Sequence, residues 1–287
     1  MANAVWTAFE ADDAAALEAA LKACANPNAI LVNGENPLAC QAARLCRRSL
    51  LEAALRCDGW GATAADQELR TPLHHAALAG DIECARTIFE LKPERVRVEM
   101  LIKQQDAGKM TSLHAAVVSG NEQLVLFLLE AGGGAAIGME NMKGLSPVHM
   151  ACSKGMAAAV EAMCKLEDGQ DAFANVGPDG ASLLHHATME GHDEVVRVLL
   201  RCGRCNPNVQ DCSGSTALHL AYALEMSEIV EALVPVTDAA LLDSQGKRAS
   251  DWRVVPEDHP PTQVATVRVG IVVQANGAAI LRTAVAS

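Results

Sequence analysis

The chain has 287 residues, a formal net charge of −12, and a composition that is 50% hydrophobic but only 3% aromatic. The acidity argues against a surface for nucleic-acid phosphates and favours a basic protein partner, and the shortage of aromatic rings argues against a large aromatic-lined pocket. The ten cysteines follow no regular framework, which favours free thiols in a reducing compartment. No apolar run approaches a membrane span, and the N-terminus, with Glu10, Asp12 and Asp13, is not typical of a secretory signal, so we expect a cytoplasmic or nuclear protein.

The first 70 residues carry a weak helical pattern. An alanine-rich stretch from Leu17 precedes the turn-forming sequence 26–29, and a second helical unit is expected to open at residues 36–38. Arg44, Arg47 and Arg48 form a compact basic cluster. We interpret this cluster as a solvated helix face.

One short phrase then returns five times, at starts 40, 35, 36 and 34 residues apart. Its copies are Thr71-Pro72-Leu73-His74-His75-Ala76, Thr111-Ser112-Leu113-His114-Ala115-Ala116, Ser146-Pro147-Val148-His149-Met150-Ala151, Ser182-Leu183-Leu184-His185-His186-Ala187 and Thr216-Ala217-Leu218-His219-Leu220-Ala221. Each opens with a hydroxyl residue suited to a helix N-cap. In four copies a glycine nine residues later suits the end of a short helix, whereas the fifth copy has Glu225 there. Apolar residues then recur at helical spacing, so each copy predicts a pair of helices in a string of similar units.

These phrases resemble the Thr-Pro-Leu-His-x-Ala signature of the ankyrin repeat family. The resemblance continues in the hairpin sequence from Asp211 to Thr216, whose glycine place is also held by Gly144, Gly180 and Gly246. It implies an all-α repeat solenoid of stacked helix-turn-helix units with β-hairpin loops, about seven repeats plus a partial one over residues 4–253. The clearest repeats span residues 71–247, and degenerate capping repeats are expected at both ends.

Two segments depart from the family pattern. The step from the first signature to the second is the longest, and its excess lies around residues 91–98, which predicts an enlarged loop. Residues 66–70 lack the hairpin glycine, so the geometry of that turn stays open.

The resemblance gives the repeated signature residues a structural role. In the family, the signature histidine hydrogen-bonds the backbone of the hairpin region and ties repeats together. The residues placed in this role, together with their hydroxyl caps, are Thr71, His74, Thr111, His114, Ser146, His149, Ser182, His185, Thr216 and His219. We therefore expect no catalytic, cofactor-binding or metal-binding residues. His75 and His186 lie one residue further along and are expected to face differently, as surface contacts.

The cysteines near residue 205 are spaced like part of a zinc or redox site, but we interpret them as neither. Cys202, Cys205 and Cys212 lack an obvious fourth ligand for tetrahedral zinc, and the Cys-x-x-Cys follows a helix instead of preceding one. The resemblance also permits asparaginyl hydroxylation at Asn28 and Asn208, which nothing in the residues requires.

The sequence also disfavours a catalytic serine nucleophile and a phosphate-binding loop. Ser112, Ser146 and Ser182 precede histidines closely, but we expect them to be N-caps whose hydroxyls bind backbone donors, and no Gly-x-Ser-x-Gly elbow is present. The glycine run 132–134 lacks the lysine of a phosphate loop and follows a helix.

The tail, residues 254–287, breaks the repeat pattern. Prolines end the helical structure, residues 267–273 are expected to form a strand, and Asn276-Gly277 predicts a type I′ hairpin turn. That turn would place Val273 opposite Ile280 and Val269 opposite Ala284. A lone hairpin is marginal in water, so the tail is expected to be poorly ordered or weakly docked, unless it pairs with another chain or begins a further domain.

The leading functional hypothesis is a non-enzymatic scaffold or adaptor that binds a protein partner on the concave face formed by hairpin tips and first helices. We expect a monomer that binds no nucleic acid and needs no cofactor. The residues proposed to contact the partner are Gln67, Glu68, His75, Met142, Lys143, Lys154, Pro178, Asp179, His186, Glu190, Ser213, Tyr222 and Gln245. The alternative is a regulatory or targeting segment of a larger enzyme or channel, and an enzyme of unrecognised type is the third hypothesis.

Overall fold

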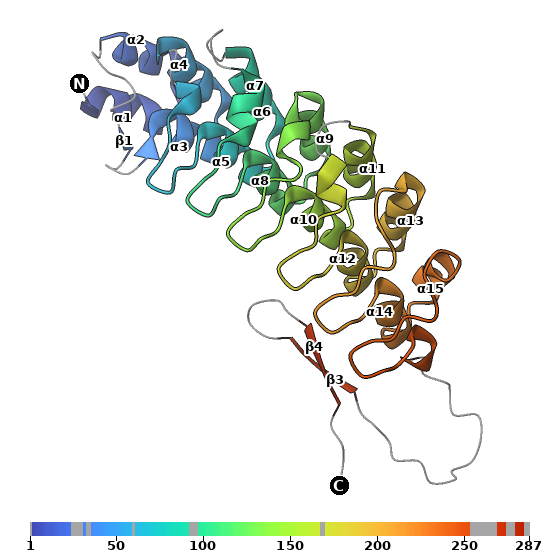
Figure 1. The fold of residues 1–287 in the computed structure, drawn as a ribbon. Helices are drawn as coiled ribbons and strands as arrows, with labels where there is room; N and C mark the ends of the chain where they lie inside the picture. Colours follow the sequence, from blue (N-terminus) through green and yellow to red (C-terminus); the bar gives the residue numbers. More distant parts are fainter. Residues whose placement is uncertain are drawn as a thin grey trace.

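The computed structural model describes residues 2–23, 31–32, 36–58, 61–91, 97–166, 170–252, 269–273 and 279–283. Successive helix pairs dominate these residues. The pairs are α1 (Ala2–Glu10) with α2 (Ala14–Lys22), α3 (Leu38–Arg44) with α4 (Arg48–Asp58), α5 (Pro72–Ala79) with α6 (Ile82–Leu91), α8 (Ser112–Ser119) with α9 (Glu122–Glu130), α10 (Pro147–Ser153) with α11 (Ala157–Lys165), α12 (Leu183–Met189) with α13 (Asp193–Cys202), and α14 (Ala217–Ala223) with α15 (Ser227–Leu233). Figure 1 shows the first helices in one row, the second helices in another, and the hairpin loops projecting from the first-helix side.

Short elements link and extend the pairs. They are β1 (Leu31–Val32), β2 (Asn36–Pro37), α7 (Val98–Lys103) and the 3-10 turns η2 (Gly61–Thr63), η3 (Gly133–Ala136), η4 (Gln170–Phe173) and η5 (Ala249–Trp252). The predicted helix-turn-helix solenoid with hairpin loops is confirmed. The number of repeats stays a prediction.

Left-handed backbone recurs at two places in each unit, and this periodicity fixes both turns. The turn between paired helices has a positive φ at Asp12, Cys46, Gly80, Gly120, Gly155, Gly191 and Glu225, and the hairpin tip has one at Leu69, Lys109, Gly144, Gly180, Gly214 and Gly246. Glu225 and Leu69 therefore keep the geometry that glycine adopts elsewhere, at φ 57° and 59°. A side chain in this region costs about 1 kcal/mol relative to glycine. The hairpin at residues 66–70 thus forms without its glycine.

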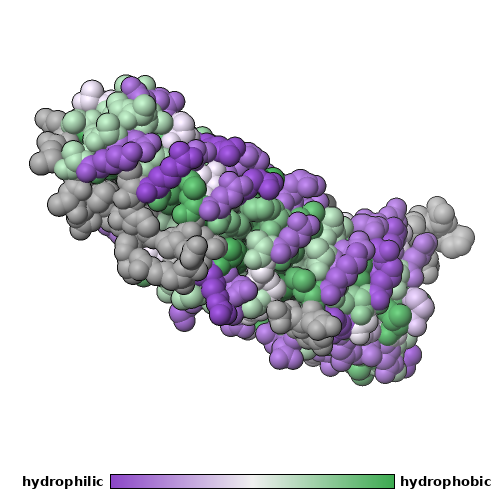
Figure 2. Space-filling model, turned by 90° about the horizontal axis from the view of Figure 1, so that it is seen from above, coloured by the Kyte–Doolittle hydropathy of each residue, from purple (hydrophilic) through white to green (hydrophobic). Residues whose placement is uncertain are grey.

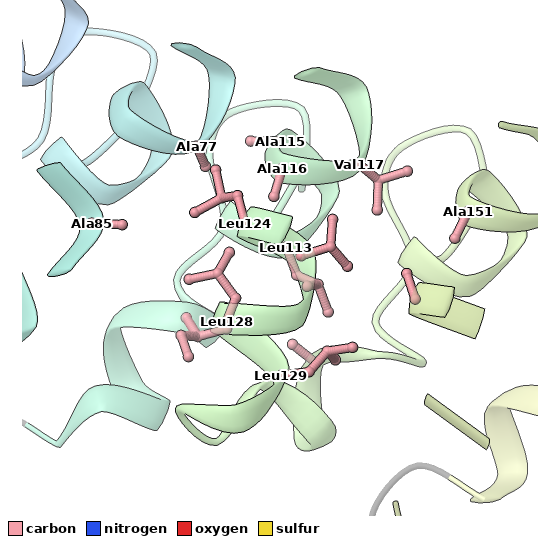
Figure 3. Close-up of a cluster of buried hydrophobic side chains, with 14 of the residues drawn as sticks. Ala77, Ala85, Leu113, Ala115, Ala116, Val117, Leu124, Leu128, Leu129 and Ala151 are labelled. Atoms are coloured by element: carbon pink, nitrogen blue, oxygen red, sulfur yellow. The ribbon is translucent and has the colours of Figure 1, made fainter. Parts of the chain in front are cut away.

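The core lies between the two helix rows and is built from leucine and alanine. Leu113 of α8 and Leu124 and Leu128 of α9 are fully buried, and alanines such as Ala77 and Ala151 from the neighbouring pairs line the same cluster (Figure 3). Small residues let adjacent pairs approach closely, while each buried leucine contributes roughly 1.5–3 kcal/mol. Because every pair shares its core with both neighbours, no pair is self-sufficient.

The excess length near residue 91 contains a helix that the sequence analysis did not anticipate. Most of the enlarged loop expected around residues 91–98 falls on residues 92–96, which lie outside the described part of the chain, so it stays a prediction. The helix α7 begins at Val98, and its Leu101 and Ile102 are fully buried. The insertion therefore adds residues to the core.

The tail contains the predicted pair of strands in a different register. β3 (Val269–Val273) and β4 (Ala279–Thr283) are antiparallel, with Val273 opposite Ala279 and Val269 opposite Thr283. The predicted pairings with Ile280 and Ala284 are wrong by one residue. The type I′ turn expected at Asn276-Gly277 falls among residues that the structure does not describe. Residues 274–278 lie outside the described part, and docking of the tail stays a prediction.

Candidate protein-binding face

The hairpin tips are joined to one another by backbone hydrogen bonds. The N–H of Ala107 donates to the carbonyl of Glu68 at 2.8 Å, and Met142 N–H donates to the Gly108 carbonyl at 3.0 Å. Cys212 N–H donates to Asp179 and Ser244 N–H to Ser213 in the same manner, each at 3.0 Å. These bonds fix the spacing of the tips that they join, and the loops form one row along the first-helix side (Figure 1).

In most hairpin tips, a short polar side chain accepts hydrogen bonds from backbone N–H groups of the same tip. In the first of them, Asp66 Oδ1 accepts from the N–H groups of Glu68 and Arg70, at 2.9 and 2.8 Å. Asp106, Asn141, Asp211 and Asp243 make the same two bonds to the residues two and four places further on. The other side chains of each tip take no part in these hydrogen bonds, so they can vary without loss of the turn.

The signature histidines tie each unit to the next hairpin. Nδ1 of His114 accepts from the Thr111 N–H at 3.0 Å, and its Nε2–H donates to the Leu145 carbonyl at 3.1 Å. His74, His185 and His219 make equivalent inter-repeat bonds to the carbonyls of Met110, Ser215 and Lys247. The structural role inferred for these four histidines agrees with this geometry.

His149 departs from the pattern. Its Nδ1 lies 2.7 Å from Ser146 Oγ, but its buried Nε2 has no hydrogen-bond partner among the described residues. Burial and, to a smaller extent, the neighbouring His186 lower its pKa to about 4, and the backbone of Asn175 opposes this shift. Burial likewise lowers the pKa of His114 to about 4, so both rings are neutral at pH 7.

His75 is not the surface contact that we expected. Its side chain is 4% exposed, and Nε2 lies 3.0 Å from Asp66 Oδ2, which also accepts from Arg70. Burial raises the pKa of Asp66, but hydrogen bonds from Arg70 and His75 more than offset this, so the net pKa is lowered. His75 therefore holds the hairpin at residues 66–70 in place. The sequence feature that could have indicated this role is the carboxylate of Asp66, nine residues before His75.

His186 is half-buried and its Nε2 is enclosed, so it offers little to a partner. Its ring packs edge-on against His149, with centroids 5.4 Å apart. Most of the other proposed contacts lie on hairpin tips, and Tyr222 lies on the first helix α14, whereas Lys154 and Glu190 are the C-cap residues of α10 and α12. Tyr222 is half-buried, and the exposed ones are Gln67, Glu68, Met142, Lys143, Lys154, Pro178, Asp179, Glu190, Ser213 and Gln245. Met142, 72% exposed, is the most solvent-exposed large apolar side chain in the described part of the chain.

The remaining candidate groups have structural surroundings. Ser112 is the first residue of α8 and not its N-cap, and its hydroxyl donates to the Ile102 carbonyl at 3.3 Å; this expectation was wrong because Thr111 already caps the helix. Ser146 and Ser182 do cap their helices, but their hydroxyls contact the ring nitrogens of His149 and His185. Among the described residues no group of His, Cys, Asp or Glu is arranged to hold a metal.

Burial raises the pKa of the Cys205 thiol to about 12, and Cys212 is exposed. Asn28 lies outside the described residues. Asn208 is exposed, and its Oδ1 accepts from the Asp238 N–H at 2.7 Å. In the basic cluster, Arg47 donates to the Phe9 carbonyl at 2.7 Å and lies over the Phe9 ring, so it packs against the first helix instead of only meeting solvent.

The opposite surface, formed by the second helices, is largely occupied by its own ion pairs. Arg48 binds Glu52 and Glu83, and Arg197 binds Asp193 and Glu228, which links successive second helices. Figure 2 shows hydrophilic bands alternating with hydrophobic patches on this upper side. The second helices also hold a shallow cleft of about 420 Å³, where Phe89 of α6 stacks on Phe127 of α9. This cleft was not predicted, and only the helical position of the two phenylalanines could have indicated it.

The family model for ankyrin repeats in three copies matches residues 70–141, 92–175, 113–211 and 149–245, together more than half of the chain. The chain belongs to the ankyrin repeat family. Ankyrin repeats are generally protein-protein interaction modules and are typically not enzymes. A crystal structure of the Bcl-3 ankyrin repeat domain, from a protein described as a unique member of the IkappaB family, has the same fold, with a TM-score of 0.64 and 20% identity over 77% of this chain and 95% of that one.

Several curated proteins resemble parts of this ankyrin array. The mouse B-cell lymphoma 3 protein homolog is 28% identical over 64% of this chain and 48% of its own length. Human Rabankyrin-5 is 30% identical over 58% of this chain and 13% of its own, and human transient receptor potential cation channel subfamily A member 1 is 32% identical over 52% and 14%. The chain thus matches about half or less of each relative. No helix among the described residues combines the length and apolarity needed to cross a bilayer.

Proposed function

We propose that this ankyrin array is a non-enzymatic scaffold or adaptor that binds a protein partner across its hairpin tips and first helices, the concave face. The row of hairpin tips, joined by backbone hydrogen bonds at four of its five steps between residues 66 and 246, carries this proposal. A preorganised row of exposed side chains binds without the cost of ordering a flexible loop. The second-helix surface is a poorer candidate because its charged side chains already pair with one another.

Four residues are central to the proposed contact. Met142 supplies adaptable apolar area, Lys143 and Asp179 supply charges of opposite sign, and Tyr222 supplies an amphipathic ring. The net charge of −12 favours a basic partner through steering of the encounter. We further propose that the chain acts as a monomer in the cytoplasm or nucleus.

Site-specific photo-crosslinking in cells tests the face. A crosslinking residue at position 143 should capture a defined partner, and one at position 165 in α11 serves as the matched lysine control on the opposite surface. Changing Met142, Lys143, Asp179 and Tyr222 together to alanine should abolish binding of that partner while leaving the circular dichroism spectrum unchanged. Unaltered binding of the fourfold variant would place the contact elsewhere.

The second candidate is a regulatory or targeting segment of a longer enzyme or channel. It is favoured by the small share of several relatives that this chain matches, 13% of Rabankyrin-5 and 14% of the cation channel. Sequencing the transcript from end to end separates the two candidates, because a longer reading frame that encodes a catalytic or channel domain supports the second.

A further inference from the structure

Among the described hairpins between residues 66 and 247, one step lacks the ties that join the others. Five neighbouring pairs of hairpins lie between residues 66 and 246, and four of them are joined by the tip-to-tip backbone bond. In the fifth, Pro178 stands where Ala107, Met142, Cys212 and Ser244 stand in the others. Proline has no N–H, so it cannot donate to the carbonyl of Lys143. The step from the 141–145 hairpin to the 177–181 hairpin therefore lacks this bond.

The polar side chain inside the tip is missing at the same step. Gly177 occupies the position of Asp66, Asp106, Asn141, Asp211 and Asp243. The second carboxylate oxygen of Asp66 holds His75, nine residues on, and that of Asp243 accepts from Trp252 Nε1, also nine residues on, at 2.8 Å. The residue nine places after Gly177 is His186, whose enclosed Nε2 has no partner in the described part of the chain. The histidine is present without its carboxylate.

The inter-repeat histidine tie is missing there too. The ties from His74, His114, His185 and His219 cross the other four steps, and the fifth would come from His149. His149 is 1% exposed, and its Nε2 makes no hydrogen bond of ordinary geometry to the described residues; the backbone of Asn175 in the next unit acts on the ring only enough to oppose the lowering of its pKa. Two connections between units, the tip-to-tip bond and the histidine tie, thus fail at the interface between the pair α10 and α11 and the pair α12 and α13, and the hairpin on its far side also lacks its internal carboxylate.

The helix side of this interface is intact. His192 Nε2–H donates to the Ser153 carbonyl at 3.1 Å, and Arg204 donates to the Leu166 carbonyl at 3.1 Å. Ser153 Oγ also lies 3.4 Å from His186 Nδ1, so the polar contacts of this interface lie on its helix side and not between its hairpin tips. Rotation of one unit about the helix side would open the hairpin side. We infer that this interface is a hinge of the array, where helices α12 to α15 swing about the His192 contact and the hairpin side opens.

The hinge has a direct geometric consequence for the tip row. Opening changes the separation between the tips at Met142 and Asp179, while tips on the same side of the hinge keep their spacing. The array thereby consists of two stiff segments whose relative angle adjusts to a partner.

Hydrogen exchange with mass spectrometry tests the hinge on the full chain. Amides in residues 141–152 and 177–190 should exchange about fivefold to tenfold faster than those in residues 106–116 and 211–221, because local opening exposes them. The variant Pro178→Ala restores the donor, and the variant Gly177→Asp restores the carboxylate. A Cβ at position 177 would lie 3.3 Å from His186 Nε2 and 3.5 Å from the Ala181 carbonyl, so the added carboxylate lies within reach of its histidine.

Each restoring variant should slow exchange in those two segments by about fivefold and leave the other segments unchanged. The reciprocal control is Ala107→Pro at an intact step, which fits the second position of the turn and should speed exchange there by a similar factor. Equal protection of all five steps in the unaltered chain would overturn the hinge. Unchanged exchange in Pro178→Ala would also overturn it, and this variant covers the case in which Gly177→Asp fails to fold.

Discussion

Acidification should destabilise the array through its buried histidine ties, and His114 provides the clearest case. Its side chain is fully buried, its Nε2–H donates to the Leu145 carbonyl, and burial lowers its pKa to about 4. Because the folded pKa lies below the value of about 6.5 expected for the unfolded chain, the stabilisation is complete above pH 6.5 and is lost as the pH falls towards 4. A difference of about 2.5 units corresponds to about 3 kcal/mol of unfolding free energy.

Urea unfolding followed by circular dichroism at pH 7.5, 6.5, 5.5 and 4.5 measures this contribution. The variant His114→Gln should be less stable than the parent by about 1–3 kcal/mol at pH 7.5, because the Leu145 carbonyl loses its donor. Between pH 6.5 and 4.5 its stability should fall less steeply than the parent's, by about 1 kcal/mol per pH unit.

The variant Leu113→Ala is the matched control. It removes a buried side chain next to His114, should cost about 2–5 kcal/mol, and introduces no change in titrating groups. Its pH dependence should therefore follow the parent's. If His114→Gln and Leu113→Ala showed the same slope, the assignment of the acid response to this histidine would be wrong.

Three further variants test the local geometry. Leu69→Gly removes a side chain held at φ 59° and should raise stability by about 1 kcal/mol, measured as an increase in the thermal midpoint. Asp66→Ala leaves the buried His75 and two hairpin N–H groups without their acceptor, and should cost about 2–4 kcal/mol in urea unfolding. Arg47→Ala removes the donor to the Phe9 carbonyl and the cation above its ring, and should raise proteolytic cleavage within residues 2–23 several-fold without affecting the central repeats.

The repeat frame was predictable because short-range chemistry sets it. A hydroxyl cap, a histidine three residues later and a glycine at each turn are recognisable in the local sequence. Glu225 and Leu69 adopt the same left-handed backbone, so the repeat geometry also forms where the glycine is missing. The burial of His75 was not predicted, because it depends on a carboxylate nine residues earlier that becomes its neighbour only after the hairpin folds. The role of Ser112 was misjudged because Thr111, one residue earlier, is the cap.

Features that depend on contacts between units were harder to predict from the sequence. The helix α7 is only six residues long, too short for a periodic signal, and its Leu101 and Ile102 are recognisable as core only once packed. The tail register differs from the prediction by one residue, because a turn signal at 276–277 specifies a turn locally whereas the pairing of β3 with β4 depends on both strands. The hydrogen bonds missing near Pro178 could not be predicted from that hairpin alone, because they are defined by the equivalent positions of the other hairpins.

The bonds between successive hairpin tips use main-chain atoms alone, so the identity of the side chain there has little influence on whether the row forms. Ala107, Met142, Cys212 and Ser244 differ widely in size and polarity, yet they occupy the same place in that row. Substitutions other than proline at these positions can therefore accumulate with little effect on folding. Recognition by this protein is free to diverge between related sequences, or to be redesigned, at a rate that the stability of the scaffold does not limit.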